Sequence, residues 1–171
     1  FKVSVPFLRP KKLSSDTSKS SAALLHAVRF MEKKNKIKYD IVIELMCTSP
    51  FKTFKDINKC IEKLIKYKAH SVIALKQLHD HHPARIKKIV NGKIKNFCVN
   101  EKIESRRQDL KPKAYVRAGA IYALNRDYFM KNKKRYGSIK SYPYILPDKR
   151  AINIDEENDF LMAETLIKNE K

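Results

Sequence analysis

The spacing of apolar and polar residues predicts helices and strands that alternate along the chain. Apolar residues recur at helical spacing over residues 24–31, after Ser18 and Ser20, either of which can cap the helix. A second helical stripe covers residues 57–65. Two β-branched runs typical of buried strands, residues 39–46 and 71–76, lie on either side of this second helix. Strand, helix and strand in this order predict a right-handed crossover, and therefore an α/β fold with a mostly parallel sheet.

The pattern changes after the second strand. Residues 86–90 and 93–97 flank Asn91-Gly92, which is the strongest short signal for a β-hairpin. We therefore expect an antiparallel excursion, residues 78–113, within a single domain of residues 1–171. The remaining predicted elements are a strand at 115–124, a short helix from about Asp127, the aromatic loop SYPYILP, a final strand ending near Asp155 and a last helix.

Four carboxylates gather within residues 151–160, although the chain as a whole carries a net charge of +20. Their simplest role is to start the last helix, with Asp155 as the N-cap and acidic residues in the first turn. The strand-like alternation of residues 152–155 also places Asn153 and Asp155 on one face, about 7 Å apart. Two oxygen ligands so placed can hold one Mg²⁺ that is shared with substrate phosphates.

Length and composition predict one globular domain. The chain has 171 residues, of which 43% are hydrophobic, and it contains no apolar run long enough to span a bilayer. We expect no membrane association, and the lack of a basic-then-apolar leader favours the cytoplasm. Cys47, Cys60 and Cys98 are widely separated, which favours reduced, structural cysteines. The histidines of residues 79–82 are interpreted as a polar loop, because no matching metal ligands accompany them.

The excess of positive charge raises the question of nucleic-acid binding. There are 38 Lys and Arg residues against 18 Asp and Glu residues, but the lysines are spread over nearly every segment and form no single block. A Lys-rich solvated surface is the simpler interpretation, and nucleic acid is not the expected partner. Polyanionic small molecules such as nucleoside triphosphates would still be attracted by this charge.

Five segments, taken in order, resemble one enzyme family. They are RPKKLSSDTSKS (9–20), LMCTSPFKTFKDI (45–57), HHPARIKKI (81–89), RRQDLKPKAYVRAGAIY (106–122) and INIDEENDFLMAE (152–164). Together they resemble the acylneuraminate cytidylyltransferases, the CMP-sialic acid synthetases. The resemblance implies a Rossmann-like three-layer nucleotide-diphospho-sugar transferase fold. It also implies that CTP and a nine-carbon 2-keto sugar acid are substrates, that Mg²⁺ is the cofactor, that pyrophosphate is released, and that residues 78–113 build a homodimer interface.

The resemblance also assigns roles to individual residues. Arg9, Ser18 and Ser20 match positions expected to contact the nucleotide. Arg85 and Arg107 match cationic positions that would hold the sugar carboxylate or the phosphates, and they are candidate catalytic groups together with Asp155. Tyr122 and Met46 fall at positions expected to line the sugar. Asp155 matches a metal-ligating aspartate, and Asn153 stands where the family has a second one.

The chain departs from the family pattern in two ways. The family's A-R-x-G-S-K loop, which cradles the triphosphate, has no counterpart here, and the chain has only three glycines. We therefore expect an N-terminally truncated chain that is inactive by itself. Near the expected sugar site, Met46, Ala118 and Asn153 replace Gln, Asn and Asp of the family pattern. The accepted sugar is then expected to differ from sialic acid, unless activity has decayed.

Three alternatives remain open at this point. A 3-deoxy-manno-octulosonate cytidylyltransferase would share the chemistry but take a different sugar. An inactive remnant would only dimerise. A basic nucleic-acid-binding protein would bind with an affinity that falls steeply with salt.

Overall fold

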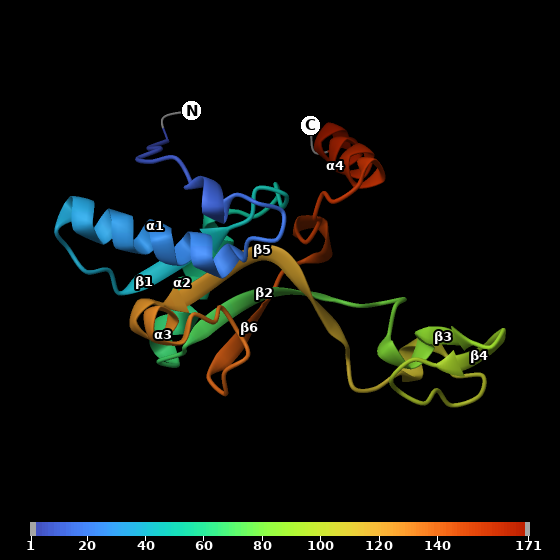
Figure 1. The fold of residues 1–171 in the computed structure, drawn as a ribbon. Coiled ribbons are helices and arrows are strands. Elements are labelled where there is room, and N and C mark those ends of the chain that lie inside the picture. Colours follow the sequence, from blue (N-terminus) through green and yellow to red (C-terminus); the bar gives the residue numbers. More distant parts are fainter. Residues whose placement is uncertain (1–2, 170–171) are drawn as a thin grey trace. The chain divides into compact units, whose positions relative to one another are not determined.

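A computed structural model describes residues 3–169 of the chain (Figure 1). The helices are α1 Ser20–Asn35, α2 Phe54–Lys66, α3 Arg126–Asn132 and α4 Glu157–Asn169. The strands are β1 Ile41–Leu45, β2 Ser71–Gln77, β3 Lys87–Val90, β4 Lys93–Asn96, β5 Tyr115–Asn125 and β6 Ser141–Ile145. Short 3₁₀ turns occur at Lys11–Leu13, Pro83–Arg85, Arg107–Asp109 and Asp148–Arg150. Across residues 3–169, none of the helices has both the length and the apolar character needed to cross a membrane.

The main sheet is mixed and not mostly parallel. Its strand order is β1-β5-β2-β6, and β1 pairs antiparallel with β5 from Ile41↔Asn125 to Leu45↔Ile121. Backbone bonds from Asn125 N to His70 O and from Leu78 N to Ala114 O show that β2 also runs antiparallel to β5. The strands β1 and β2 therefore point the same way, as the crossover through α2 requires. The prediction of a mostly parallel sheet was wrong because β5 inserts between them in the opposite direction.

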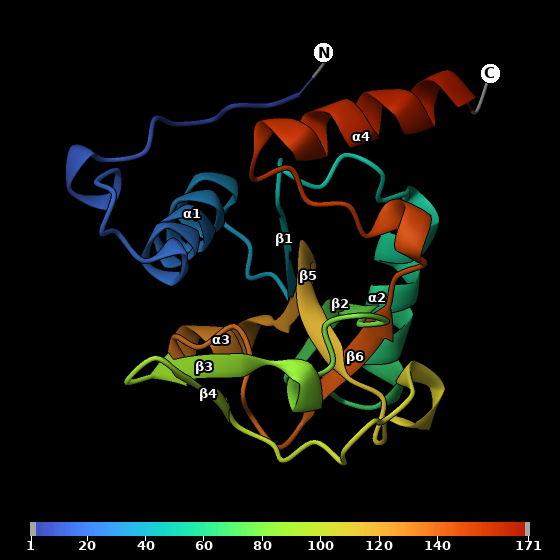
Figure 2. The same cartoon turned by 90° about the vertical axis from the view of Figure 1, so that its right-hand side faces the viewer.

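The chain divides into two compact units. The first contains the residues up to Leu45, Phe54–Ile73 and Ile121–Tyr142. Four consecutive residues of β5, Ile121–Leu124, are buried, which shows that both faces of this strand are covered. In Figure 2, α1 and α2 lie on opposite sides of the strands, and they contribute buried residues from their apolar faces, as the helical stripes predicted.

The second unit consists of Met46–Thr53, Ala74–Ala120 and the residues from Pro143 on. It contains the predicted hairpin, in which Asn91 and Gly92 have φ of 52° and 71°, as a two-residue turn between twisted strands requires. All eight residues of β3 and β4 are exposed. The only buried residue of α4 in the described part of this helix is Ala163, so its apolar stripe is mostly exposed.

Two predictions near the C-terminus, one of a strand and one of a loop, are wrong. Residues 151–154 are extended but do not form a strand, whereas the predicted loop SYPYILP contains β6. The segment pairs because its aromatic and β-branched residues suit a strand, and because β6 lies at the edge of the sheet. An edge strand tolerates Pro143, which lacks a backbone N–H.

The predicted helix caps are also displaced. The N-cap of α1 is Lys19, without a side-chain bond, while the Ser18 hydroxyl lies 2.8 Å from that of Ser15. Asp155 is not the N-cap of α4, because the backbone carbonyl of Glu156 accepts the first helical bond. The carboxylate of Asp159 instead accepts bonds from the backbone N–H groups of residues 155 and 156, both at 3.0 Å. Asp155 is thereby released from capping.

Candidate functional site

The loop that follows β1 is held from two sides within the second unit. The backbone N–H of Met46 donates to the carbonyl of Ala120 at 3.1 Å. The backbone N–H of Ile154 donates to the carbonyl of Thr48 at 2.8 Å. These bonds place the extended segment before α4 next to the loop, although more than 100 residues separate them in sequence.

A chain of side-chain hydrogen bonds leads from this loop to Asp155. The Thr48 hydroxyl donates to Oδ1 of Asn153 at 2.7 Å, and the fully buried Ser49 hydroxyl lies 3.4 Å from the same atom. The amide Nδ2 of Asn153 in turn donates to Oδ2 of Asp155 at 2.5 Å. The side chain of Asp155 is exposed, so its carboxylate is oriented by an amide and remains accessible.

Gly119 allows this arrangement. Its φ is +63°, and a Cβ atom at this position would lie 3.4 Å from Oδ1 of Asn153. The Ser49 hydroxyl also lies 3.5 Å from the carbonyl of Gly119. The glycine therefore lets strand β5 adopt a left-handed residue where it passes the Asn153 amide.

Lys52 holds the loop together through hydrogen bonds, and the sequence analysis did not predict this role. Its Nζ donates to the carbonyls of Met46 at 2.6 Å and Ser49 at 2.5 Å. Burial lowers the pKa of Lys52, and the nearby Cys47 opposes this shift. The residue was missed because a lysine in a loop carries no signal that distinguishes a brace from a solvated cation.

The donor set of this site offers a hard cation the exposed carboxylate of Asp155. No group of three or more His, Cys, Asp or Glu side chains within residues 3–169 could hold a metal ion. One accessible carboxylate at Asp155 nevertheless fits Mg²⁺, which is usually bound by one or two carboxylates together with substrate phosphates. His79 and His82 make other contacts: both ring nitrogens of His82 are hydrogen-bonded, and Nε2 of His79 lies 3.0 Å from the carboxylate of Asp148.

Arg107 lies in a basic pocket of the same unit. The pocket has a volume of about 240 Å³, and its lining includes Arg107, Lys111 and Lys113. The guanidinium of Arg107 donates to Asp80 at 2.7 Å and thereby holds the pKa of that carboxyl below its usual range. Both side chains of this pair are well exposed, at 59% and 67%, so the pair itself is weak.

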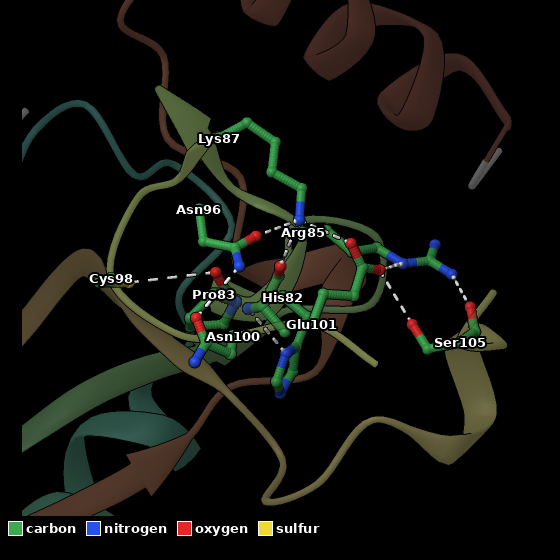
Figure 3. A network of polar contacts seen from close by, with 10 residues as sticks. His82, Pro83, Arg85, Lys87, Asn96, Cys98, Asn100, Glu101 and Ser105 are labelled. Atoms are coloured by element: carbon green, nitrogen blue, oxygen red, sulfur yellow. Dashed lines mark hydrogen bonds and ion pairs between the residues drawn. The ribbon is translucent and has the colours of Figure 1, made fainter. Parts of the chain in front are cut away.

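Arg85 belongs to a different network, shown in Figure 3. It donates to the carbonyl of Ser105 at 2.9 Å and lies 3.6 Å from Glu101. Glu101 also accepts hydrogen bonds from Lys87 at 2.7 Å and from the Ser105 hydroxyl at 2.9 Å, and these lower its pKa. Arg85 is therefore engaged in holding the excursion together.

The other predicted residues lie in the first unit. Arg9 and Ser20 are exposed, and Ser18 is partly exposed. Tyr122 is buried, with the guanidinium carbon of Arg135 4.8 Å from its ring centroid. The structure thus brings Met46, Asn153 and Asp155 together around one loop. Their roles, and those of the other site residues, stay predictions.

Comparison with known proteins gives a consistent picture. A pseudaminic acid cytidylyltransferase of Campylobacter jejuni (strain 81-176) is 30% identical over 170 residues, covering 95% of this chain and 68% of that protein. The post-translational flagellin modification protein B of Campylobacter coli is 25% identical over 167 residues, covering 95% and 67%. No protein-family model matches the chain.

The fold is similar to that of a solved structure. The structure of CMP:2-keto-3-deoxy-manno-octonic acid synthetase complexed with CTP superposes with a TM-score of 0.55 at 14% sequence identity. The match covers 91% of this chain and 70% of that one. At this identity the likeness concerns the fold, which is the α/β arrangement of that synthetase.

Proposed function

This chain belongs to the acylneuraminate cytidylyltransferase family, and we propose that it serves to transfer CMP from CTP to a pseudaminic-acid-like sugar, with release of pyrophosphate. The observation that carries the proposal is the 30% identity to a pseudaminic acid cytidylyltransferase over 95% of the chain. In this reaction the anomeric hydroxyl of the sugar attacks the α-phosphorus of CTP, and the bond to pyrophosphate breaks. Such chemistry depends on positioning and charge neutralisation and needs no nucleophile from the protein.

Asp155 is the proposed protein ligand of Mg²⁺. It is exposed, free of the capping role that its position first indicated, and held by the Asn153 amide. When bound there, the cation would neutralise negative charge on the nucleotide phosphates. The residues around it contribute orientation: the loop of Met46 and Thr48 is fixed to the segment before α4 by backbone bonds.

Arg107 is the proposed contact for the carboxylate of the sugar acid. An exposed ion pair such as Arg107–Asp80 is weak because water competes for both charges, so a substrate carboxylate can replace Asp80 at small cost. Lys111 and Lys113 add positive charge to the same pocket. Arg85 has partners that are less exposed, and we propose it as the weaker candidate. Arg9, Ser18 and Ser20 remain the proposed nucleotide contacts, and Tyr122 the proposed wall of the sugar site.

The side chain of Met46 favours a substrate other than sialic acid. It offers a thioether where the family pattern has an amide, so a polar substituent facing it would lose a hydrogen bond, which costs about 1–3 kcal/mol. We therefore propose that the accepted sugar presents an apolar group at this point. A substrate panel containing pseudaminic acid, N-acetylneuraminic acid and 3-deoxy-manno-octulosonic acid separates this proposal from its closest enzymatic alternative.

The test measures CMP-sugar and pyrophosphate formed from CTP and Mg²⁺. We expect no turnover from the chain alone, because it carries no counterpart of the A-R-x-G-S-K loop, and turnover once a segment with that loop is joined to it. Asp155→Asn in the joined protein removes the proposed Mg²⁺ ligand and should lower kcat by at least about tenfold. If the joined protein transfers CMP to none of the three sugars, the proposed function is wrong.

We further propose that the excursion of residues 78–113 forms a homodimer interface. A two-stranded hairpin is marginally stable in water by itself, yet both faces of β3–β4 are exposed. Ile89 and Ile94 face each other across the strands and are 79% and 76% exposed. Phe97 and Ile103 add exposed apolar surface nearby in the sequence. A second copy of the chain would remove this surface from water.

Light scattering after size-exclusion chromatography tests the dimer. We expect a mass of two chains for the wild type and of one chain for Ile94→Glu, which places a charge at the interface. The matched control is Ile139→Glu, because Ile139 is 98% exposed and lies outside the excursion. A wild-type monomer at micromolar concentration, or equal masses for the two variants, would contradict the proposal.

A further inference from the structure

We infer that Asn153 acts as a hydrogen-bond donor that positions the Asp155 carboxylate, and that it is not itself an oxygen ligand of the cation. The inference rests on the proposed function only for the identity of that cation. It differs from what the family pattern implies for this position, where a second aspartate would supply another carboxylate. Of the two positions, Asp155 alone would then offer an oxygen ligand to the metal.

The orientation of the Asn153 amide follows from its partners. A carboxylate can only accept hydrogen bonds, so the atom 2.5 Å from Oδ2 of Asp155 must be the amide nitrogen. The opposite end, Oδ1, faces the hydroxyls of Thr48 and Ser49, which can donate. In this orientation every contact is favourable, and the bond to Asp155 belongs to the strong, charge-assisted class.

The main competing arrangement is the flipped amide. Gly119, which has no Cβ, leaves room for the Asn153 amide, and the hydroxyls of Thr48 and Ser49 lie 2.7 and 3.4 Å from its Oδ1. A flip of the amide would exchange the places of its oxygen and its nitrogen. The exchange would keep hydrogen bonds to the hydroxyls, since these can also accept, but it would replace the bond to Asp155 by a contact between two oxygens. Only a bound cation could compensate for that contact.

Thr48 holds the Asn153 amide in place next to Asp155. Its hydroxyl lies 2.7 Å from Oδ1 of Asn153, and its backbone carbonyl accepts the N–H of Ile154. Thr48 is therefore hydrogen-bonded both to the side chain of Asn153 and to the backbone next to it. Outer-shell partners of this kind typically change metal affinity by about 10–100-fold when they are removed.

The first experiment follows the Asn153 side-chain amide by ¹⁵N–¹H NMR on the full chain. The resonance is assigned by its absence in Asn153→Asp. We expect one amide proton to be shifted downfield by the bond to the carboxylate, to lose that shift in Asp155→Ala, and to keep it when Mg²⁺ is added. Loss of the shift on adding Mg²⁺ to the wild type would mean that the oxygen has turned to the metal, and this would overturn the inference.

The second experiment measures Mn²⁺ binding to the full chain by electron paramagnetic resonance, without nucleotide. We expect Asp155→Ala and Thr48→Val each to lower the affinity by at least about tenfold. Asp148→Asn is the matched control, because Asp148 is an exposed carboxylate of the same unit and should leave the affinity unchanged. Unchanged binding in Thr48→Val, with an unchanged amide resonance, would refute the positioning role.

The two proposals can fail separately. If the wild type takes up no Mn²⁺, the cation assignment of the proposed function is wrong, while the amide resonance alone still decides whether Asn153 donates to Asp155. If Mn²⁺ binds as expected but no sugar receives CMP in the joined protein, the proposed function fails and the positioning role stands. Thermal unfolding of each variant shows whether a loss of binding comes from a loss of folding.

Discussion

Glu32 and Arg126 form the ion pair whose removal should most clearly destabilise the first unit. Arg126 donates through Nε to Oε1 of Glu32 at 2.7 Å and through Nη2 to Oε2 at 2.5 Å. The backbone N–H of Tyr39 donates to Oε1 at 3.2 Å. The side chains are only 18% and 14% exposed, so water cannot replace these bonds freely. The pair connects α1 to the start of α3.

The expected cost of Glu32→Gln follows from these contacts. A hydrogen bond to a charged group contributes about 1.5–3 kcal/mol, and glutamine keeps one acceptor oxygen while turning an N–H₂ group toward the guanidinium. We therefore expect a loss of about 2–3 kcal/mol in the free energy of unfolding. For a chain of this size that corresponds to a fall in Tm of about 4–12 °C.

Urea unfolding at pH 7 measures the cost, and its pH dependence checks the cause. The hydrogen bonds from Arg126 lower the pKa of Glu32 below its usual 4.5. The stability that this carboxylate adds is therefore present above pH 4.5 and is lost as the pH falls through the folded-state pKa. Because glutamine does not titrate, the difference between wild type and Glu32→Gln should shrink below pH 4.5.

The matched control is Glu164→Gln. Glu164 lies 3.7 Å from Lys168 on α4, and the side chains are 47% and 77% exposed, so the same chemical change should cost less than about 0.5 kcal/mol. If Glu32→Gln and Glu164→Gln destabilise the protein equally, the partly buried pair contributes no more to stability than the exposed one.

Three further predictions concern the candidate site and the core. Burial lowers the pKa of Lys52, so between the folded-state pKa and 10.5 the unfolded chain binds more protons than the folded one. The stability of the wild type relative to Lys52→Met should therefore rise with pH over this range. Urea unfolding at several pH values measures this change. Gly119→Ala and Gly137→Ala should each lower the free energy of unfolding by about 1–2 kcal/mol, because both positions have positive φ. If Gly119→Ala is more destabilising than Gly137→Ala by more than about 1 kcal/mol, the contact of the new methyl group with Asn153, and not the backbone conformation, dominates. Burial raises the pKa of Cys60 to about 12, so a thiol reagent should modify two cysteines in the folded protein and the third only after unfolding.

The sequence alone determined most of the local structure. The i, i+3, i+4 spacing predicted α1 and α2, and Asn91-Gly92 predicted the hairpin, because a helix face or a two-residue turn is encoded by residues close together in the chain. The ordered motifs also identified the family. Predictions made at element boundaries, such as the caps at Ser20 and Asp155, were less accurate because a cap depends on hydrogen-bond partners and not on periodicity.

The tertiary structure decided the direction of β5, the partners of the arginines and the orientation of the Asn153 amide. Periodicity states which face of a strand is buried but not which strand pairs with it, so β5 could not be placed between β1 and β2 in advance. Likewise, the sequence predicted Asn153 and Asp155 as two metal ligands. Only the fold brings Thr48, 105 residues away, within 2.7 Å of Asn153, and a polar side chain takes its role from the partner that the fold supplies.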